Sequence, residues 1–209
     1  MAETVALSMR IVDASGYHEP RDAISHDWLR RVAAWGMTPV LVPNILADVS
    51  AFLDAAHPRL LILTGGDDPG APGERHATES RLIDYALLRA LPILGVCRGL
   101  QVLNLRFGGR LTEIAGHVAT MHEIAVDAPF RDAYGAHETV NSYHALGIMP
   151  DGLAGALAPF ARDASGAIEG AYHRAHPLVG LMWHPERVGA PAGDARLARS
   201  LVERGAFWA

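Results

Sequence analysis

The residues with the clearest chemical potential are a lone cysteine and a distant His-Pro-Glu tripeptide. Cys97 is the single cysteine of the 209-residue chain and lies in the segment Gly-Val-Cys-Arg-Gly at residues 95–99. His184 and Glu186 belong to the tripeptide far downstream. A thiol can act as a nucleophile, an imidazole as its general base and a carboxylate as the group that orients the base. Together they predict covalent attack on an acyl carbon.

The surroundings of Cys97 indicate a sharp turn between a strand and a helix. An apolar run precedes the cysteine, and the residues after it have helical spacing of apolar side chains. Glycines two positions away on each side let two backbones pass where a β-carbon would clash. We therefore expect a nucleophile elbow, in which the helix N-terminus favours the thiolate over the thiol. The alternative is an inert buried cysteine that packs as a small apolar side chain.

One short segment can present His184 and Glu186 together. Alternate positions of an extended backbone face the same side, and Pro185 favours an extended conformation in the residue before it. Because the apolar run at residues 179–183 precedes the pair, we expect it at the end of a strand. Glu186 would then hold His184 in the useful tautomer and stabilise the imidazolium.

Several other polar groups could stabilise an oxyanion or bind a substrate. The N–H of Arg98 directly follows the nucleophile, and the Gly65-Gly66 turn could supply a second donor, although it could equally be an ordinary end to a strand. Gln101, one helical turn past Cys97, either binds substrate or is a solvated helix residue. The remaining substrate-binding candidates lie in two polar segments: Asn141, Ser142, Tyr143 and His144 in one, and Tyr17 and Arg21 in the other. His144 is also an alternative candidate for the general base.

Composition excludes several classes of function. The net charge of −5 gives no electrostatic case for nucleic acid or an anionic membrane, and no apolar run is long enough to span a bilayer. The N-terminus lacks the pattern of a signal peptide, so we expect a cytoplasmic protein. Neither His117 with His122 nor His173 with His176 has the helical pattern of a zinc site, so no metal is predicted. Phosphate-binding glycine motifs are also missing, so no nucleotide cofactor is predicted.

The order of elements predicts an α/β fold in a single domain at residues 1–209. Predicted strands lie at residues 5–12, 38–42, 59–64 and 91–96, and residues 16–22 are predicted to form a loop. Predicted helices lie at residues 23–35, 49–56, 78–90, 99–107 and 191–204. This alternation predicts a mostly parallel sheet. Short, partly alternating segments then predict appended antiparallel strands at residues 121–126, 139–142, 159–163, 167–173 and 179–183.

Six stretches, in family order, resemble the class I glutamine amidotransferase-like superfamily and its γ-glutamyl hydrolase branch. They are residues 63–66, 75–79, 95–104, 140–144, 167–170 and 183–186. The resemblance implies a flavodoxin-like core with helices on both faces of the sheet. It also implies a Cys97-His184-Glu186 triad and an oxyanion hole at Gly66 and Arg98. Gln101 would touch the γ-glutamyl group, with Gly65 close by.

The chain also departs from the pattern of this branch. His76 and Leu146 stand where the family more often has Asp and Gln, and the loop after Gly66 is shorter. The segment at residues 19–23 looks more like the γ-glutamyl-CDP-amidate hydrolases than the γ-glutamyl-γ-aminobutyrate hydrolases. The expected activity is therefore hydrolysis of a small γ-glutamyl conjugate, through a γ-glutamyl thioester, to release glutamate.

Two other functions stay open at this point. The chain could be a glutaminase subunit that delivers ammonia to a synthetase partner, although Arg98 and the acidic residues after Gly66 favour stand-alone hydrolysis. It could instead be a non-catalytic binding module. A homodimer is compatible with each of these functions.

Overall fold

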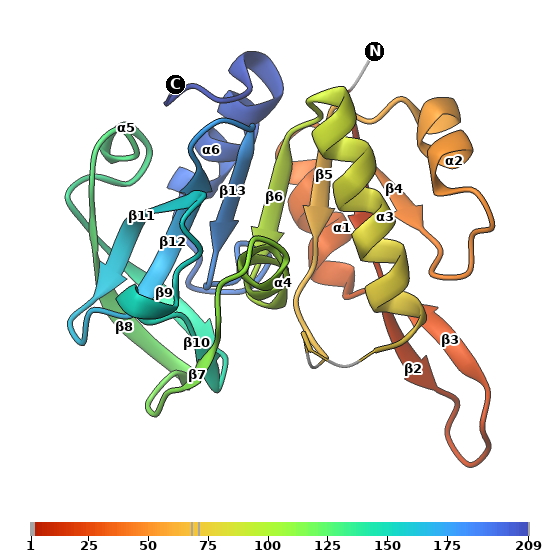
Figure 1. Ribbon diagram of the computed structural model, residues 1–209, viewed down its shortest axis with the longest axis horizontal. Helices are drawn as coiled ribbons and strands as arrows, with labels where there is room; N and C mark the ends of the chain where they lie inside the picture. Colours follow the sequence, from red (N-terminus) through yellow and green to blue (C-terminus); the bar gives the residue numbers. More distant parts are fainter. Residues whose placement is uncertain (1–2, 68, 71, 209) are drawn as a thin grey trace.

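The computed structural model describes residues 3–67, 69–70 and 72–208, and within them a nine-stranded sheet organises the fold (Figure 1). One half of this sheet is parallel. Its strands, in spatial order, are β4 (Thr38–Val42), β1 (Thr4–Ser8), β5 (Leu60–Leu63), β6 (Ile93–Val96) and β13 (Leu178–Leu181). Every residue of β5, β6 and β13 is buried, as expected for strands covered on both faces.

The other half of the sheet is antiparallel. It continues from β13 through β12 (Ile168–His173), β11 (Leu157–Asp163), β8 (Val118–Val126) and β9 (His137–Tyr143). The predicted antiparallel additions are therefore present, with one correction. Residues 179–183 were expected among them, but β13 pairs in parallel with β6 and antiparallel with β12. Because the segment is short, it was predicted to be a peripheral strand. It lies instead at the junction of the two halves, where every one of its residues is buried.

Helices cover both faces of the sheet. The helices α1 (His26–Ala34) and α6 (Gly193–Arg204) share one apolar cluster with Val5 and Leu7 of β1. Ala6, which points to the opposite face, belongs to a second cluster. That cluster contains side chains of α2 (Val49–Ala56), α3 (Glu74–Arg89) and α4 (Arg98–Arg106). Figure 1 shows α3 in front of the strands and α1 behind them.

The N-terminal region differs from the sequence-based expectation. The predicted strand at residues 5–12 is two strands, because the chain leaves the main sheet after Ser8 and continues as β2 (Arg10–Asp13). The predicted loop at residues 16–22 contains part of β3 (Pro20–Ala23), which pairs antiparallel with β2. Figure 1 shows this hairpin extending away from the main sheet. Its strands are largely exposed, so they lack the apolar pattern that identifies a buried strand.

Other differences concern short elements and helix ends. Helix α3 begins at Glu74 rather than at residue 78, because its first turn carries Arg75 into a buried polar network. The elements that were not predicted are α5 (Arg131–Tyr134), the pair of β7 (Thr112–Glu113) with β10 (Leu146–Gly147), and a 3-10 turn (Pro150–Gly152). They are too short to show a period in sequence. None of the helices in the described part of the chain is long and apolar enough to cross a membrane.

Candidate active site

Cys97 occupies the sharp turn between β6 and α4. Its φ of 51° and ψ of −105° lie outside the usual regions for a residue with a side chain. The turn depends on two close backbone approaches. A β-carbon on Gly95 would lie 2.8 Å from the carbonyl carbon of Gly99, and one on Gly99 would lie 2.2 Å from the carbonyl oxygen of Leu63. The glycines therefore allow the tight strand–turn–helix that the sequence predicts.

Parallel pairing of β6 with β13 brings the two distant motifs together. Val96 pairs with Leu181, and the N–H of Cys97 donates to the Leu181 carbonyl at 2.7 Å. Because the two strands run in the same direction, the residues that follow each one emerge at the same edge of the sheet. His184 is thereby delivered to the edge that carries Cys97.

The imidazole of His184 has a defined orientation. Its Nδ1 lies 2.8 Å from Oε1 of Glu186, and the carboxylate can only accept, so Nδ1 carries the proton. Nε2 is buried and has no hydrogen-bond partner among the described residues. Asn141 fixes the backbone of His184, since Oδ1 accepts from its N–H at 2.9 Å and Nδ2 donates to its carbonyl at 3.0 Å. Nε2 therefore has the free lone pair that a general base requires.

Gly65 is the common neighbour of the thiol and the imidazole. A β-carbon there would lie 2.8 Å from Cε1 of His184 and 3.6 Å from Cβ of Cys97. The two side chains thus converge over one glycine of the loop after β5. The ends of three adjacent parallel strands, β5, β6 and β13, bring these residues together from distant parts of the sequence.

Burial raises the pKa of the Cys97 thiol to about 12. A hydrogen bond from the backbone N–H of Arg98 lowers it, whereas the nearby negative charge of Glu186 raises it further. The helix N-terminus thus favours the thiolate, as expected, but the loss of water outweighs this N–H donor and the resting sulfur is a thiol. A base must remove the thiol proton as the sulfur attacks.

A buried ionic network shapes the loop beside the thiol. Arg75 donates to the carbonyls of Gly65 at 3.1 Å and Gly66 at 3.0 Å, and its Nε donates to Glu79 at 3.0 Å. Because N–H and C=O point in opposite directions in a trans peptide, fixing the Gly65 carbonyl on Arg75 turns the Gly66 N–H away from it. Glu79 also accepts from the guanidinium of Arg98. The side chain of Arg98 is therefore held inside the protein, while its N–H remains beside the sulfur.

A pocket of about 360 Å³ opens over Cys97. Seven predicted site residues line it: Gly66, Cys97, Arg98, Gln101, Tyr143, His144 and His184. The other lining residues are Asp67, Pro69, Ala145, Leu146 and Arg187. Gln101 donates through Nε2 to the Leu146 carbonyl at 2.7 Å, so its amide has a fixed position in the wall. A larger hollow of about 680 Å³ lies between α2, α3 and α6, but Cys97 and His184 do not line it.

Four predicted substrate-binding residues lie elsewhere. Asn141 and Ser142 are buried and do not line the pocket; Asn141 holds His184, and the Ser142 hydroxyl donates to the His117 carbonyl at 2.7 Å. Tyr17 and Arg21 lie on the β2–β3 hairpin, where Tyr17 is 58% exposed and its hydroxyl accepts from Arg21 at 2.9 Å. They also do not line the pocket, because the hairpin leaves the sheet edge that the predicted loop was expected to follow.

Two features that the fold assembles were not predicted from the sequence. Arg187 lines the pocket, with its guanidinium carbon 4.0 Å from the centroid of the Tyr143 ring, and its position directly after Glu186 was an available signal. Asp163 joins His117 and His122 in a group of possible metal ligands. No spacing rule in the sequence connects Asp163 to these histidines, because strand pairing alone brings them together.

The elbow cysteine, the His–Glu pair that follows the adjacent parallel strand, and the flavodoxin-like sheet are those of a class I glutamine amidotransferase-like protein. The chain belongs to the Peptidase C26 family, whose profile matches residues 5–186. Membership of this family supports a hydrolase that acts on amide bonds.

Relatives of the chain carry different functional names. It is 32% identical over 166 residues to a candidate glutamine amidotransferase of Schizosaccharomyces pombe, covering 70% of this chain and 64% of that protein. It is 32% identical over 174 residues to the glutamine-hydrolysing GMP synthase subunit of Methanosarcina mazei, covering 80% and 84% of the two chains. It is 24% identical over 192 residues to the γ-glutamyl-CDP-amidate hydrolase of Campylobacter jejuni, covering 88% and 90%.

The fold is also similar to solved structures. A candidate GMP synthase subunit of Thermoplasma acidophilum superposes with a TM-score of 0.71 and 22% identity, covering 97% of this chain and 93% of that one. At this level of identity the similarity establishes the fold alone, which agrees with the predicted fold class.

Proposed function

We propose that the chain is a cysteine hydrolase that cleaves the γ-glutamyl amide bond of a small conjugate and releases glutamate. The main observation that supports this proposal is the tautomer and position of the His184 imidazole. Glu186 holds the proton on Nδ1, so the unpartnered Nε2 keeps its lone pair, and the imidazole and the Cys97 side chain both approach Gly65. A protonated thiol beside a correctly oriented neutral imidazole is the arrangement that nucleophilic catalysis requires.

In the proposed first step, Nε2 of His184 takes the thiol proton while the sulfur attacks the γ-carbonyl carbon of the substrate. The N–H groups of Gly66 and Arg98 stabilise the oxyanion that forms; in well-studied hydrolases one such donor contributes about 3–4 kcal/mol. The C–N bond then breaks, and His184 returns its proton to the departing nitrogen. The products of this step are a γ-glutamyl thioester on Cys97 and a free amine or phosphoramidate.

In the second step, His184 takes a proton from water, and the resulting hydroxide attacks the thioester carbon. The C–S bond breaks, the sulfur recovers a proton from His184, and glutamate leaves. Glu186 stabilises the imidazolium in both steps and keeps the ring in one tautomer. No redox or cofactor step is needed to balance the reaction.

The pocket supports a small, polar acyl group and a leaving group near its rim. Its volume of about 360 Å³ is at the lower end of the range for ligand sites, and Gln101 and Tyr143 contribute polar groups to the wall. Arg187 supplies a cation that suits an anionic leaving group, such as a phosphorylated amine. The relative named γ-glutamyl-CDP-amidate hydrolase, which aligns with most of both chains, supports a leaving group of this kind.

A second candidate function is that of a glutaminase subunit. The similarity to the GMP synthase subunit of Methanosarcina mazei and to the anthranilate synthase component 2 of Mycobacterium tuberculosis favours it. The same triad would then hydrolyse glutamine, and the ammonia would pass to a synthetase partner. The two functions share their chemistry and differ in the leaving group and in the need for a partner.

The test is to measure glutamate release by the purified chain from glutamine, γ-glutamyl-γ-aminobutyrate and γ-glutamyl-CDP-amidate, with Cys97→Ala as the blank. We expect one conjugate to be hydrolysed with a kcat/KM at least about 100-fold above that of glutamine. Release from glutamine alone, increasing when a copurifying synthetase is added, would establish the second candidate. Undiminished turnover by Cys97→Ala would overturn both.

A further inference from the structure

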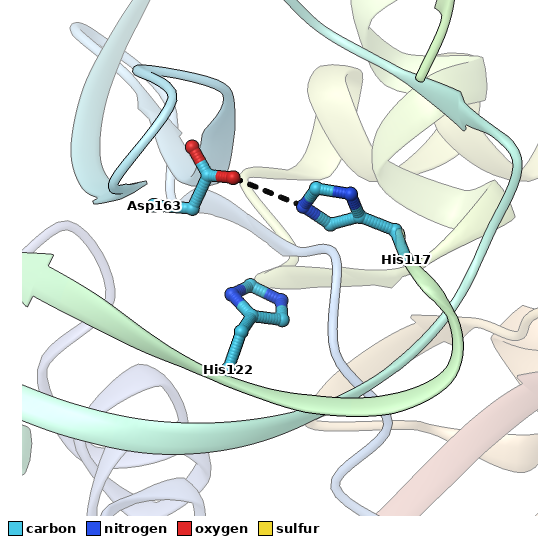
Figure 2. Close-up of side chains that lie close together, drawn as sticks. All are labelled: His117, His122 and Asp163. Atoms are coloured by element: carbon cyan, nitrogen blue, oxygen red, sulfur yellow. Dashed lines mark hydrogen bonds and ion pairs between the residues drawn. The ribbon is translucent and has the colours of Figure 1, made fainter. Parts of the chain in front are cut away.

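Three histidines surround two carboxylates on the antiparallel side of the sheet. His117 precedes β8, His122 lies within β8, and His144 follows β9. Asp163 ends β11, and Glu169 lies on β12. Figure 2 shows His117, His122 and Asp163 directed toward a common space, and one donor atom from each lies within 4.8 Å of the others.

The proton positions on two of these histidines follow from their partners. Nδ1 of His117 lies 3.0 Å from the Ala115 carbonyl, and Nδ1 of His144 lies 3.1 Å from the Leu146 carbonyl. A carbonyl oxygen only accepts, so Nδ1 carries the proton in both rings. Nε2 of each ring, which is directed toward the other members of the cluster, then carries either a second proton or a lone pair that can bind a metal ion.

The Nε2 atoms of all three histidines face carboxylate oxygens. Nε2 of His117 lies 3.1 Å from Oδ2 of Asp163 and 3.6 Å from Oε1 of Glu169. Nε2 of His122 lies 3.7 Å from Oε2 of Glu169, and Nε2 of His144 lies 3.7 Å from Oε1 of the same carboxylate. Lone pairs and carboxylates at this separation repel one another, so the cluster needs positive charge, either from protons on the Nε2 atoms or from a metal ion between the groups.

Glu169 strengthens the requirement for a cation. It is 0% exposed, and neither of its side-chain oxygens has a hydrogen-bond partner among the described residues. A buried carboxylate without a partner is costly, so such groups are normally paired or bound to metal. Two backbone hydrogen bonds fix the orientation of the Asp163 carboxylate, because its Oδ1 accepts from the N–H of Ser165 at 2.9 Å and from that of Ala167 at 2.8 Å.

We propose that His117, His122, Asp163 and Glu169 form a binding site for one divalent transition-metal ion of the zinc type. With metal–ligand bonds of about 2.0–2.2 Å, neighbouring ligand atoms of a tetrahedral site are separated by about 3.3–3.6 Å. Nε2 of His117 lies 3.1 Å from Asp163 and 3.6 Å from Oε1 of Glu169, which is close to this range, and Nε2 of His122 lies 3.7 Å from the other Glu169 oxygen, Oε2. The donor atoms of His117, His122 and Asp163 lie within 4.8 Å of one another, so the ligands would move slightly closer together around the ion. Two carboxylates balance the charge of a divalent ion. The bond from Nδ1 of His117 to a backbone carbonyl is the outer contact that metal-bound histidines usually make.

The bound ion has a structural role in this arrangement. It ties β8, β11 and β12 together and neutralises Glu169, which faces His144. His144 also lines the pocket over Cys97, so the ion stabilises the wall of the proposed substrate site from behind. The inference concerns metal affinity, and it stands or falls independently of the hydrolase reaction.

The test uses the Cys97→Ser variant, so that zinc cannot bind to the thiol. The chain is freed of metal with a chelator, and Zn²⁺ binding is measured by calorimetry and by elemental analysis after dialysis. Co²⁺ then serves as a spectroscopic probe, since its visible spectrum distinguishes four-coordinate from six-coordinate sites. We expect one ion per chain, a tetrahedral Co²⁺ spectrum and a higher melting temperature with Zn²⁺.

Matched variants locate the site. Asp163→Asn and His122→Ala should each weaken Zn²⁺ binding by at least about tenfold, whereas His137→Ala, at an exposed histidine of β9, should leave it unchanged. If His122→Ala fails to fold, the near-isosteric Asp163→Asn decides the question. Less than one ion per chain at tens of micromolar Zn²⁺, or equal weakening by His137→Ala, would overturn the proposal and leave protonated histidines as the balancing charge.

Discussion

A β-carbon on Gly65 would lie 2.8 Å from Cε1 of His184. Replacing Gly65 by Ala must therefore displace the imidazole or the loop that follows β5. We expect Gly65→Ala to lower kcat by about 100-fold, because a shift on the order of 1 Å in a catalytic group has this cost. Gly155→Ala is the matched control, since a β-carbon there meets nothing within 4 Å. Equal activity of both variants would show that His184 tolerates the displacement.

The hydrogen bond between Glu186 and Nδ1 of His184 should affect the chemical step rather than binding. Glu186→Gln keeps the shape of the side chain but favours the wrong imidazole tautomer. We expect kcat to fall by roughly 10³–10⁴-fold with a nearly unchanged KM. The control is Glu203→Gln on the exposed side of α6. A large increase in KM instead would assign Glu186 to substrate binding.

The raised pKa of Cys97 predicts how the free thiol reacts. With a pKa of about 12, the thiolate fraction increases about tenfold for each pH unit through the neutral range. Alkylation of the free enzyme by iodoacetamide should therefore accelerate continuously from pH 6 to pH 10, measured by mass spectrometry. A plateau below pH 8 would contradict this prediction, because it would indicate a stable thiolate–imidazolium pair in the resting site.

Asp194 gives a separate prediction about stability. Burial raises the pKa of this carboxyl to about 7, although hydrogen bonds from Trp183 at 3.0 Å and Tyr134 at 2.8 Å lower it. The folded protein thus prefers the protonated form more than the unfolded chain does. The stabilisation is complete below about pH 4 and is lost as the pH rises through about 7.

Asp194→Asn removes this titration while keeping an oxygen that accepts from both donors. Urea unfolding at pH 5 and pH 8 measures the effect. Relative to the variant, the wild type should lose about 2–3 kcal/mol of unfolding free energy between the two values. Parallel behaviour of the two proteins would mean that Asp194 titrates near its normal pKa.

Arg187 should contribute to the binding of anionic leaving groups. We expect Arg187→Met to raise KM for γ-glutamyl-CDP-amidate by about tenfold, with little change for an uncharged γ-glutamyl amide, because the cation lies at the pocket rim. Arg174→Met, at an exposed position outside the pocket lining, is the control. A similar loss for both substrates would indicate that Arg187 acts through its stacking on Tyr143 instead.

The parts of the fold and site that the sequence predicts are those with strong local signals. The elbow at Cys97, the buried strands and the His184–Glu186 pair each depend on a few adjacent residues. Pairing partners depend on the whole chain, so the parallel register of β13 with β6 was not predicted. Asn141 was predicted to bind substrate, but its amide holds the backbone of His184 instead, a role that no local pattern reveals.

The exposed β2–β3 hairpin is a second example of a spatial arrangement that local sequence does not show. Tyr17 and Arg21 have residue types that suit a polar ligand, but residue type alone does not show where a segment points. The pairing of β2 with β3 turns them away from the pocket that contains Cys97. Arg187 was not predicted because the adjacent His-Pro-Glu motif already accounted for the function of that segment.

Because Val96 pairs with Leu181, different parts of the chain determine the catalytic geometry and the choice of leaving group. This register brings thiol and imidazole together through direct strand pairing, and the long chain segment between α4 and β13 adds the two hydrogen bonds from Asn141 to the backbone of His184. That segment also builds the antiparallel half of the sheet and contributes Tyr143, His144 and Leu146 to the pocket. Substitutions and insertions there that keep Asn141 in place can therefore change which leaving group is accepted without changing the reaction chemistry.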